Sequence, residues 1–200
     1  MEHQEDNAAS YDSICAWYEQ VTKDSDYGVD YVSKAIEKNI IKKSALDVGC
    51  GVGGAILTNL ICIGYKTTAL DFSRKMLEIA KRRHPEVHFI EADFRGWDSE
   101  KKFSLVVAWD SLIHIPTSQL NSAITKLCNL LEENGVLIFT GGGVEGDIRG
   151  EMNGVTFSYG SLSYIECLDI IEKCGCEILT MERDQEGPHM VYICRKLANK

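Results

Sequence analysis

A glycine-rich turn after a short apolar stretch is the sequence feature that most restricts the fold of this chain. Residues 44–48 read Ser-Ala-Leu-Asp-Val and predict a buried strand, and four of the next six residues are glycines. The apolar residues of 53–63 then predict a buried helix. A strand that turns through glycines into a helix predicts the first unit of an α/β sheet, with the turn at the ligand-binding edge.

The rest of the chain continues this alternation of strands and helices. Apolar stripes and capping residues predict further helices over 11–22, 28–40, 73–83 and 120–131. Ser163-Tyr-Ile-Glu166 fits a capping box and predicts another helix, which ends at Gly175. Further strands are expected at 67–71, 87–90, 103–108, 136–140, 176–183 and 189–195. The glycine-rich stretch 141–150 is expected to be a flexible loop, followed by a short extended piece at 155–159.

Strands that alternate with helices of 10 to 15 residues predict right-handed βαβ units and a parallel sheet. Gly187-Pro188 lies between the last two predicted strands, so that pair is expected to form a hairpin and the last strand to run antiparallel. The expected fold class is therefore α/β, a seven-stranded and mostly parallel sheet with helices on both faces, in a three-layer sandwich. The 200 residues show no linker or repeat, so one domain over 1–200 is expected.

Composition and charge narrow the partners that we expect. The net charge of −9 repels phosphate backbones, which counts against nucleic acid, and the basic run Lys81–Arg83 suits the end of a helix. Apolar runs are shorter than the roughly 20 residues that a membrane span needs, and the polar, acidic segment 1–10 is unlike a signal peptide. We expect a cytoplasmic monomer or homodimer that acts on a small molecule.

The cysteine pattern predicts no metal site. Eight cysteines occur without a Cys-x-x-Cys pair, and Cys174-Gly-Cys176, the only close pair, has no histidine beside it at a zinc-ligand spacing. Most of the other cysteines fall inside apolar runs. They are interpreted as small core residues in a reducing compartment.

An acidic residue lies where a ribose-binding group belongs. Asp71 ends the second predicted strand, 20 residues after Gly51 of the glycine turn. A carboxylate at that place can accept hydrogen bonds from both hydroxyls of a ribose. The turn and Asp71 together predict a nucleoside site.

The same turn also matches the dinucleotide fingerprint GxGxxG over residues 49–54, so an NAD(P)-dependent oxidoreductase is the first alternative. Asp47 argues against it, because an anion two residues before the first glycine is unfavourable beside a pyrophosphate and favourable beside an ammonium or sulfonium. Glu91-Ala-Asp93 adds a polar group after the third strand that suits an adenine amino edge. A second alternative is a non-catalytic nucleoside-binding protein, because fold and site do not fix function.

Five segments in order resemble the motifs of class I, Rossmann-like S-adenosylmethionine-dependent methyltransferases. Asp47-Val-Gly-Cys-Gly-Val-Gly resembles their first motif, DxGxGxG, and 71–76 resembles the second, with its acidic residue, serine and methionine. Residues 92–94 resemble the third, and 103–116 resemble the fourth strand and its loop. Residues 131–139 resemble the segment that follows, with Asn134 in place of the usual proline. The loop after the fourth strand lacks the Asn/Asp-Pro-Pro-Tyr pattern of enzymes that methylate nucleobases or amide nitrogens.

The resemblance implies S-adenosylmethionine as cofactor and assigns residues to it. Asp47 and the 49–53 turn would hold the methionine end, Asp71 the ribose, and Asp93 the adenine amine. The residues implied in cofactor binding are Tyr18, Asp47, Gly49, Cys50, Gly51, Gly53, Asp71, Phe72, Met76, Ala92, Asp93, Phe94 and Trp109. The first 40 residues or so are implied to form a helical lid, as the N-terminal helix often does in this class.

Acceptor and catalytic candidates follow from their place near the methyl group. Trp109 and Asp110 come just after the fourth strand, and His114 in the same loop is a candidate base or, alternatively, a residue that orients the loop. The substrate candidates are Tyr11, His114, Arg149, Tyr159 and His189.

Overall fold

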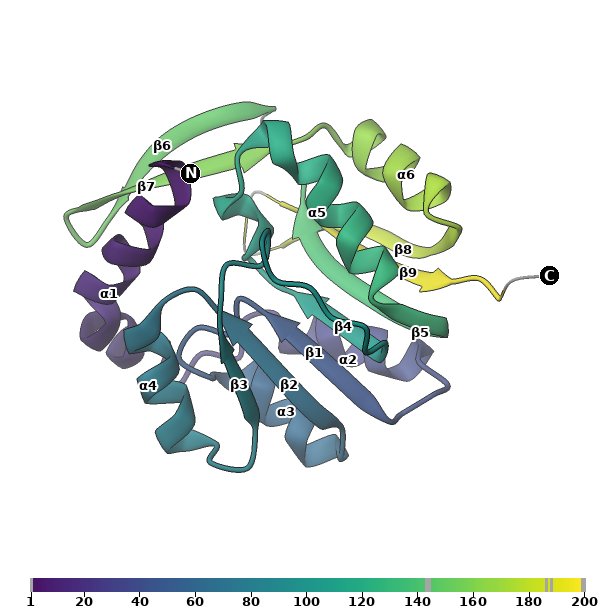
Figure 1. The fold of residues 1–200 in the computed structure, drawn as a ribbon, viewed down its shortest axis with the longest axis horizontal. Coiled ribbons are helices and arrows are strands. Elements are labelled where there is room, and N and C mark those ends of the chain that lie inside the picture. Colours follow the sequence, from purple (N-terminus) through teal and green to yellow (C-terminus); the bar gives the residue numbers. More distant parts are fainter. Residues whose placement is uncertain (1, 143–144, 186, 188, 199–200) are drawn as a thin grey trace.

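The computed structural model describes residues 2–142, 145–185, 187 and 189–198, and it confirms the α/β class (Figure 1). Seven strands form one sheet in the order β3-β2-β1-β4-β5-β9-β8. They are β1 (Ser44–Val48), β2 (Lys66–Asp71), β3 (His88–Glu91), β4 (Phe103–Ala108), β5 (Leu131–Gly141), β8 (Cys176–Arg183) and β9 (Met190–Lys196). The first five pair in parallel, whereas β9 runs antiparallel to β5 and β8 on either side of it. The expected antiparallel last strand is thus confirmed.

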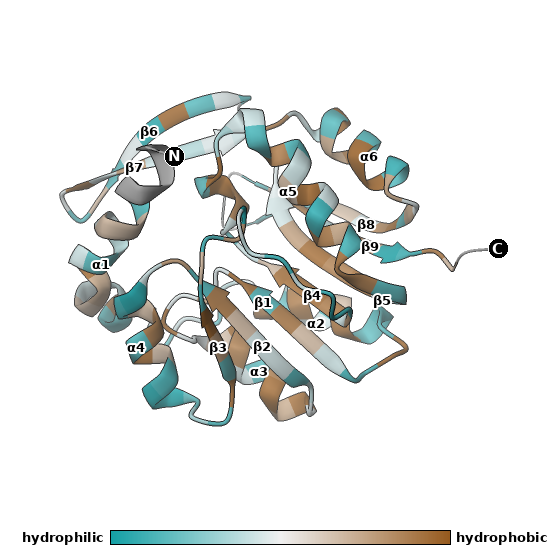
Figure 2. Cartoon of the chain, viewed as in Figure 1, coloured by the Kyte–Doolittle hydropathy of each residue, from teal (hydrophilic) through white to brown (hydrophobic). Residues whose placement is uncertain are grey.

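Helices cover both faces of this sheet and produce the expected three layers. Leu105 and Val107 of β4 pack toward α2 (Val29–Lys38) and α3 (Ala55–Ile63), whereas Val106 and Ala108 pack toward α5 (Thr117–Asn129) and α6 (Tyr164–Lys173). Successive side chains of a strand point to opposite faces, so every residue of β4 is buried. Figure 2 shows the resulting hydrophobic colour along the central strands.

The N-caps of two helices follow the sequence prediction. The Ser73 side chain accepts a hydrogen bond from the Met76 N–H and begins α4 (Arg74–Arg83). Ser163 and Glu166 form the predicted capping box at the start of α6. Each cap satisfies backbone donors that have no partner within the helix.

The prediction of a flexible loop over 141–150 is wrong for Gly141, which ends β5, and for 146–150, whereas residues 143 and 144 lie outside the described residues. Residues of β6 (Gly146–Met152) pair antiparallel with β7 (Val155–Ser161), and the hairpin stands apart from the main sheet. Asn153 and Gly154 connect the strands with φ of 50° and 73°. Asn-Gly is the preferred pair for a two-residue turn with both φ values positive, so the hairpin had a clear local basis in the sequence.

The helix predicted over 120–131 ends earlier than expected, at Asn129. Leu131 already pairs with Phe103 as the first residue of β5, and a register shift follows in that strand pair. Asn134 has a φ of 63° within the irregular part of β5. The Asn134-Gly135 pair therefore lies in an irregular, bulged part of the strand.

The long helix α1 (Glu2–Thr22) lies outside the three layers. It packs against α4 and β7, and Figure 1 shows it running between them at one end of the sheet. Across the described residues, each helix is too short or too polar to be a candidate membrane span.

Candidate active site

A cavity of about 340 Å³ opens at the carboxyl ends of β1, β2 and β4, where the sequence predicted a site. Residues of α1 and the β6–β7 hairpin also line it, so these two elements cover the edge of the sheet. Many of the sequence-predicted residues meet there: Tyr11, Tyr18, Asp47, Gly49, Cys50, Gly51, Asp71, Phe72, Met76, Trp109, Asp110, His114 and Tyr159.

The glycine turn forms the floor of this cavity. Gly49, Gly51 and Gly53 have φ of 76°, 54° and 66°, a region that side chains disfavour. A Cβ on Gly49 would collide with Cβ of Ser111, whereas a Cβ on Gly51 would meet nothing within 4 Å. Gly49 is therefore required by packing, and Gly51 leaves its backbone open to a ligand.

Asp71 at the end of β2 points toward this turn. Its carboxylate accepts one hydrogen bond from the Gly51 N–H at 2.8 Å and another from the Ser73 N–H at 2.8 Å. Burial raises the pKa of Asp71 to about 6, and these backbone donors oppose the increase. The carboxylate thus connects the glycine turn after β1 to the residues that follow β2, at the cavity wall.

Asp47 on β1 is a buried carboxylate on the cavity wall. Burial, and then the charge of Asp71, raise the pKa of Asp47 to about 7. Among the described residues, none donates a hydrogen bond to it. A buried anion without a donor is costly unless a cation or a hydrogen-bond donor meets it, so this wall of the cavity suits a positively charged group.

The residues after β4 are held in a specific arrangement. The Trp109 ring stacks on Tyr31 with centroids 5.4 Å apart, and its buried Nε1 lacks a hydrogen-bond partner among the described residues. Asp110 has a φ of 46°, and its backbone N–H donates to Thr140 Oγ1 at 2.8 Å. The Thr140 hydroxyl in turn donates to Asp110 Oδ1 at 2.9 Å. Such a sparsely populated backbone conformation persists only where its surroundings stabilise it.

His189, the residue before β9, approaches the same carboxylate. Its Nε2 lies 3.9 Å from Asp110 Oδ1, although His189 is not itself on the cavity wall. Burial raises the pKa of Asp110, and the charge of His189 opposes this.

His114 connects three elements above the cavity. Its Nε2 lies 2.8 Å from the Tyr11 hydroxyl of α1. Its Nδ1 lies 3.2 Å from Asn7 Nδ2 and 3.3 Å from the Ser158 carbonyl of β7. The imidazole is buried and packs edge-on against Tyr11. Its contacts are those expected of a residue that positions the loop after β4 relative to α1 and the β6–β7 hairpin.

Several predicted residues do not line the main cavity. Asp93 is held by Arg95, whose Nη2 lies 2.7 Å from Asp93 Oδ2. Phe94 lines a small adjacent cavity, and Gly53 packs on Ala80. Ala92 and His189 are also not among the lining residues, and neither is Arg149. Arg149 pairs with Ser158, one position from the pairing of Ile148 with Tyr159, so its exposed side chain lies on the opposite face of the hairpin from Tyr159.

The fold also brings to this site some residues that the sequence did not predict. Tyr27 lines the cavity, and its hydroxyl donates to Asp184 Oδ2 at 2.5 Å. Ser111 lines it beside Gly49, and buried Asn7 donates to the Ser158 carbonyl at 2.9 Å. Gly28, next to Tyr27, has a φ of 85°, and a Cβ there would collide with the Trp109 ring, but the sequence alone carries no signal for this contact.

Comparison with known proteins agrees with this arrangement. Residues 45–135 match the family model described as "Methyltransferase domain". A malonyl-[acyl-carrier protein] O-methyltransferase from Enterobacter lignolyticus is 36% identical over 96 residues, which cover 48% of this chain and 37% of that protein. The chain therefore spans little more than a third of the length of that relative.

Two solved structures have the same fold. An S-adenosylmethionine-dependent methyltransferase from Clostridium acetobutylicum superposes with a TM-score of 0.71 at 17% identity, over 94% of this chain and 99% of that one. The magnesium protoporphyrin IX methyltransferase of Synechocystis, with bound S-adenosylmethionine, gives 0.67 at 18% identity, over 96% and 83%. The domain match overlaps the segments that carry the five motifs, and the solved structures share the expected fold.

Proposed function

We propose that this chain, which carries a methyltransferase domain with the class I fold, transfers the methyl group of S-adenosylmethionine to a small-molecule acceptor. The observation that supports this most directly is the pair of buried carboxylates, Asp47 and Asp71, on either side of the glycine turn. Asp71 accepts a hydrogen bond from the Gly51 N–H, and Asp47 faces the cavity without a hydrogen-bond donor among the described residues. This wall suits a ligand with ribose hydroxyls at one end and a cation at the other.

Different residues of the cavity would bind different parts of the cofactor. Asp47 and the turn of Gly49, Cys50 and Gly51 would hold the cationic methionine end, and Asp71 the ribose. Phe72 and Met76 would contact the adenosine, with Tyr18 and Trp109 covering the ligand. Asp93 has no part in this proposal, because Arg95 already occupies its carboxylate.

When bound, the sulfonium supplies the activated methyl group, and the protein has to align the acceptor and exclude water. We propose that α1 acts as the lid that does this within a single domain over 1–200. The expected lid over the first 40 residues or so is thereby shortened, because α2 packs on the sheet. Tyr11 and Tyr18 of α1 lie on the cavity wall, and Tyr159 of the hairpin lies there too. His114 would position α1 and the β6–β7 hairpin rather than remove a proton, because both of its ring nitrogens lie within hydrogen-bond distance of residues in these two elements.

The charges around the cavity favour a neutral or positively charged acceptor. Asp47, Asp71 and Asp110 line it, and the described lining residues include neither lysine nor arginine. A carboxylate or phosphate on the acceptor would be desolvated near Asp110 without an arginine or lysine of the wall to pair with it. Aromatic side chains such as Tyr27 and Trp109 instead attract cations through their ring faces.

The strand order and Asp47 count against the NAD(P) alternative. Dinucleotide-binding sheets commonly have the order 3-2-1-4-5-6, whereas an antiparallel β9 lies between β5 and β8 here. Asp47 would also lie close to a pyrophosphate that the glycine turn held. A protein that binds the nucleoside without catalysis stays the second alternative, and only a turnover measurement separates it.

We further propose that the enzyme acts in the cytoplasm as a monomer or homodimer, without nucleic acid or membrane partners. Its eight cysteines are all unpaired, as in a reducing compartment.

Thermal unfolding with S-adenosylhomocysteine and, separately, with NAD tests the cofactor. S-adenosylhomocysteine should raise the Tm, because a ligand that binds only the folded state stabilises it, and NAD should leave the Tm unchanged. Release of S-adenosylhomocysteine is then measured over a library of amines, phenols and carboxylic acids. Stabilisation by NAD alone would overturn the proposed function. Binding without turnover of any compound would favour the non-catalytic alternative.

A further inference from the structure

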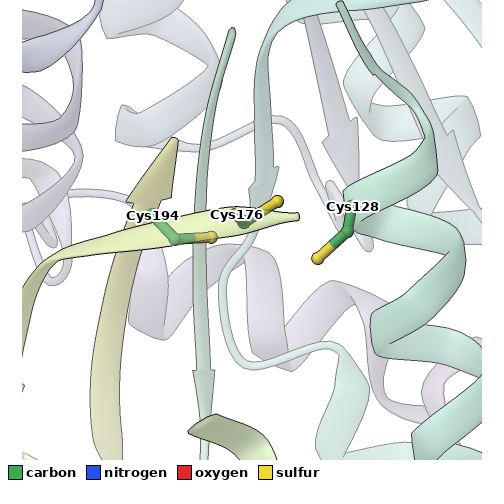
Figure 3. Close-up of side chains that lie close together, drawn as sticks. All are labelled: Cys128, Cys176 and Cys194. Atoms are coloured by element: carbon green, nitrogen blue, oxygen red, sulfur yellow. The ribbon is translucent and has the colours of Figure 1, made fainter. Parts of the chain in front are cut away.

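Three cysteines from separate elements meet in the core, away from the active-site cavity. Cys128 belongs to α5, Cys176 to β8 and Cys194 to β9, and their Sγ atoms all lie within 4.8 Å of one another. All three are buried, and Figure 3 shows them gathered between α5 and the two C-terminal strands. The sequence analysis expected no metal site, because only Cys174 and Cys176 are close along the chain.

The register of the sheet explains this meeting. Cys176 pairs with Lys196 across the β8–β9 ladder, so Cys194, two residues earlier on β9, lies on the same face. That face packs against α5 and α6, and Cys128 is in the last turn of α5. The chain therefore places three soft sulfur ligands at one point of an otherwise apolar interface.

A cation would meet this cluster beside a lysine, because Lys196 pairs with Cys176 across the β8–β9 ladder. The thiolate is the metal ligand, so a cation that binds here has to displace thiol protons.

We propose that Cys128, Cys176 and Cys194 form a structural site for a thiophilic d¹⁰ cation, with Zn²⁺ as the ion to be tested. Three sulfurs at the limit of 4.8 Å leave a centre about 2.8 Å from each, and a Zn–S bond is about 2.3 Å. At this limit each sulfur has to move by about 0.5 Å toward the centre. A tetrahedral site needs a fourth ligand, and a water is the candidate for it.

Binding exchanges protons for metal in a defined ratio. Three thiols and one Zn²⁺ give Zn(SR)₃⁻ and three protons, or two protons where one thiol is already deprotonated. The single negative charge left on the site lies near Lys196, which pairs with Cys176 and limits the cost of burying the charge. The occupied site would join α5 to β8 and β9, which close the sheet at its end.

The test is a zinc titration of the whole reduced protein in competition with a chelating dye, on native protein and on protein refolded with Zn²⁺. One equivalent should bind, and the affinity should rise 100- to 1,000-fold per pH unit while the thiols are protonated. Cys128→Ser and Cys194→Ser should each weaken binding at least 100-fold. Cys167→Ser, a buried cysteine on the same face, and Cys62→Ser, an exposed one on α3, should bind as the wild type does.

Cobalt gives a readout that needs no variant. Co²⁺ bound to the wild-type protein should show intense thiolate-to-metal charge-transfer absorption, which Zn²⁺ then removes. Binding retained in both Cys128→Ser and Cys194→Ser, or no stoichiometric binding by either route of loading, would overturn the proposal. Because S-adenosylhomocysteine binding is measured separately, neither result affects the proposed function.

Discussion

The carboxylate of Asp71 accepts a hydrogen bond from the Gly51 N–H at 2.8 Å, across 20 positions of the sequence. The bond joins the ends of β1 and β2 and places an acid next to the only glycine of the turn whose Cβ position is both strained and open. Gly53, by contrast, would press a Cβ against Ala80. Gly51 and Asp71 therefore form one ligand-facing unit, from which the first prediction follows.

Replacing Asp71 with Ala should weaken S-adenosylhomocysteine binding by about 10- to 150-fold, because a hydrogen bond to a charged group contributes about 1.5–3 kcal/mol. Isothermal titration calorimetry measures this directly. Asp98→Ala, at a side chain that is 88% exposed, serves as the control. Equal affinities in wild type and Asp71→Ala would remove Asp71 from the cofactor site.

Asp47 should make the ligand-free protein less stable as the pH rises. Its pKa is about 7 in the folded state against 3.8 as the ordinary value, so between these values the folded state binds more protons than the unfolded state. Stability is therefore lost as the pH rises from 4 to 7, with a limit of about 4 kcal/mol for about three pKa units.

Asp47→Asn should accordingly unfold at higher temperature than the wild type at pH 8, by about 2 kcal/mol in unfolding free energy, because the buried amide keeps part of the desolvation cost. The advantage should disappear near pH 4. The same variant should bind S-adenosylhomocysteine at least tenfold more weakly. Parallel pH profiles of stability for wild type and variant would contradict this role of Asp47.

Gly49 and Gly51 should respond differently to alanine. Gly49→Ala should cost about 3 kcal/mol, from left-handed backbone strain and the collision with Ser111. Gly51→Ala should cost only about 1–2 kcal/mol but weaken cofactor binding, because its Cβ enters the cavity. Urea unfolding and calorimetry check the pair, and equal losses of stability would show that packing does not distinguish the two positions.

His114 is expected to act through position. His114→Ala and Asn7→Ala both break the network that joins α1 to β7, so both should increase amide hydrogen exchange in these two elements. Once a substrate is known, both should lower turnover to a similar extent. A large loss in His114→Ala alone, with a pH profile that changes shape, would indicate instead that the imidazole moves a proton.

The order of strands and helices, the glycine turn and the place of Asp71 could be predicted from the sequence, because each depends on residues close along the chain. Apolar periodicity sets the element, and a glycine with positive φ is a local requirement. The β6–β7 hairpin belongs to this class as well, since Asn153-Gly154 is a local indication that was overlooked.

The remaining features depended on tertiary structure, because they involve residues that lie far apart in the sequence and that no local pattern relates to one another. The fold put Arg149 on the outer face of the hairpin and placed His114 between α1 and β7. It also collected Cys128, Cys176 and Cys194, which lie far apart in the sequence, around one point. Local periodicity determines which elements form, but only their packing decides which side chains meet.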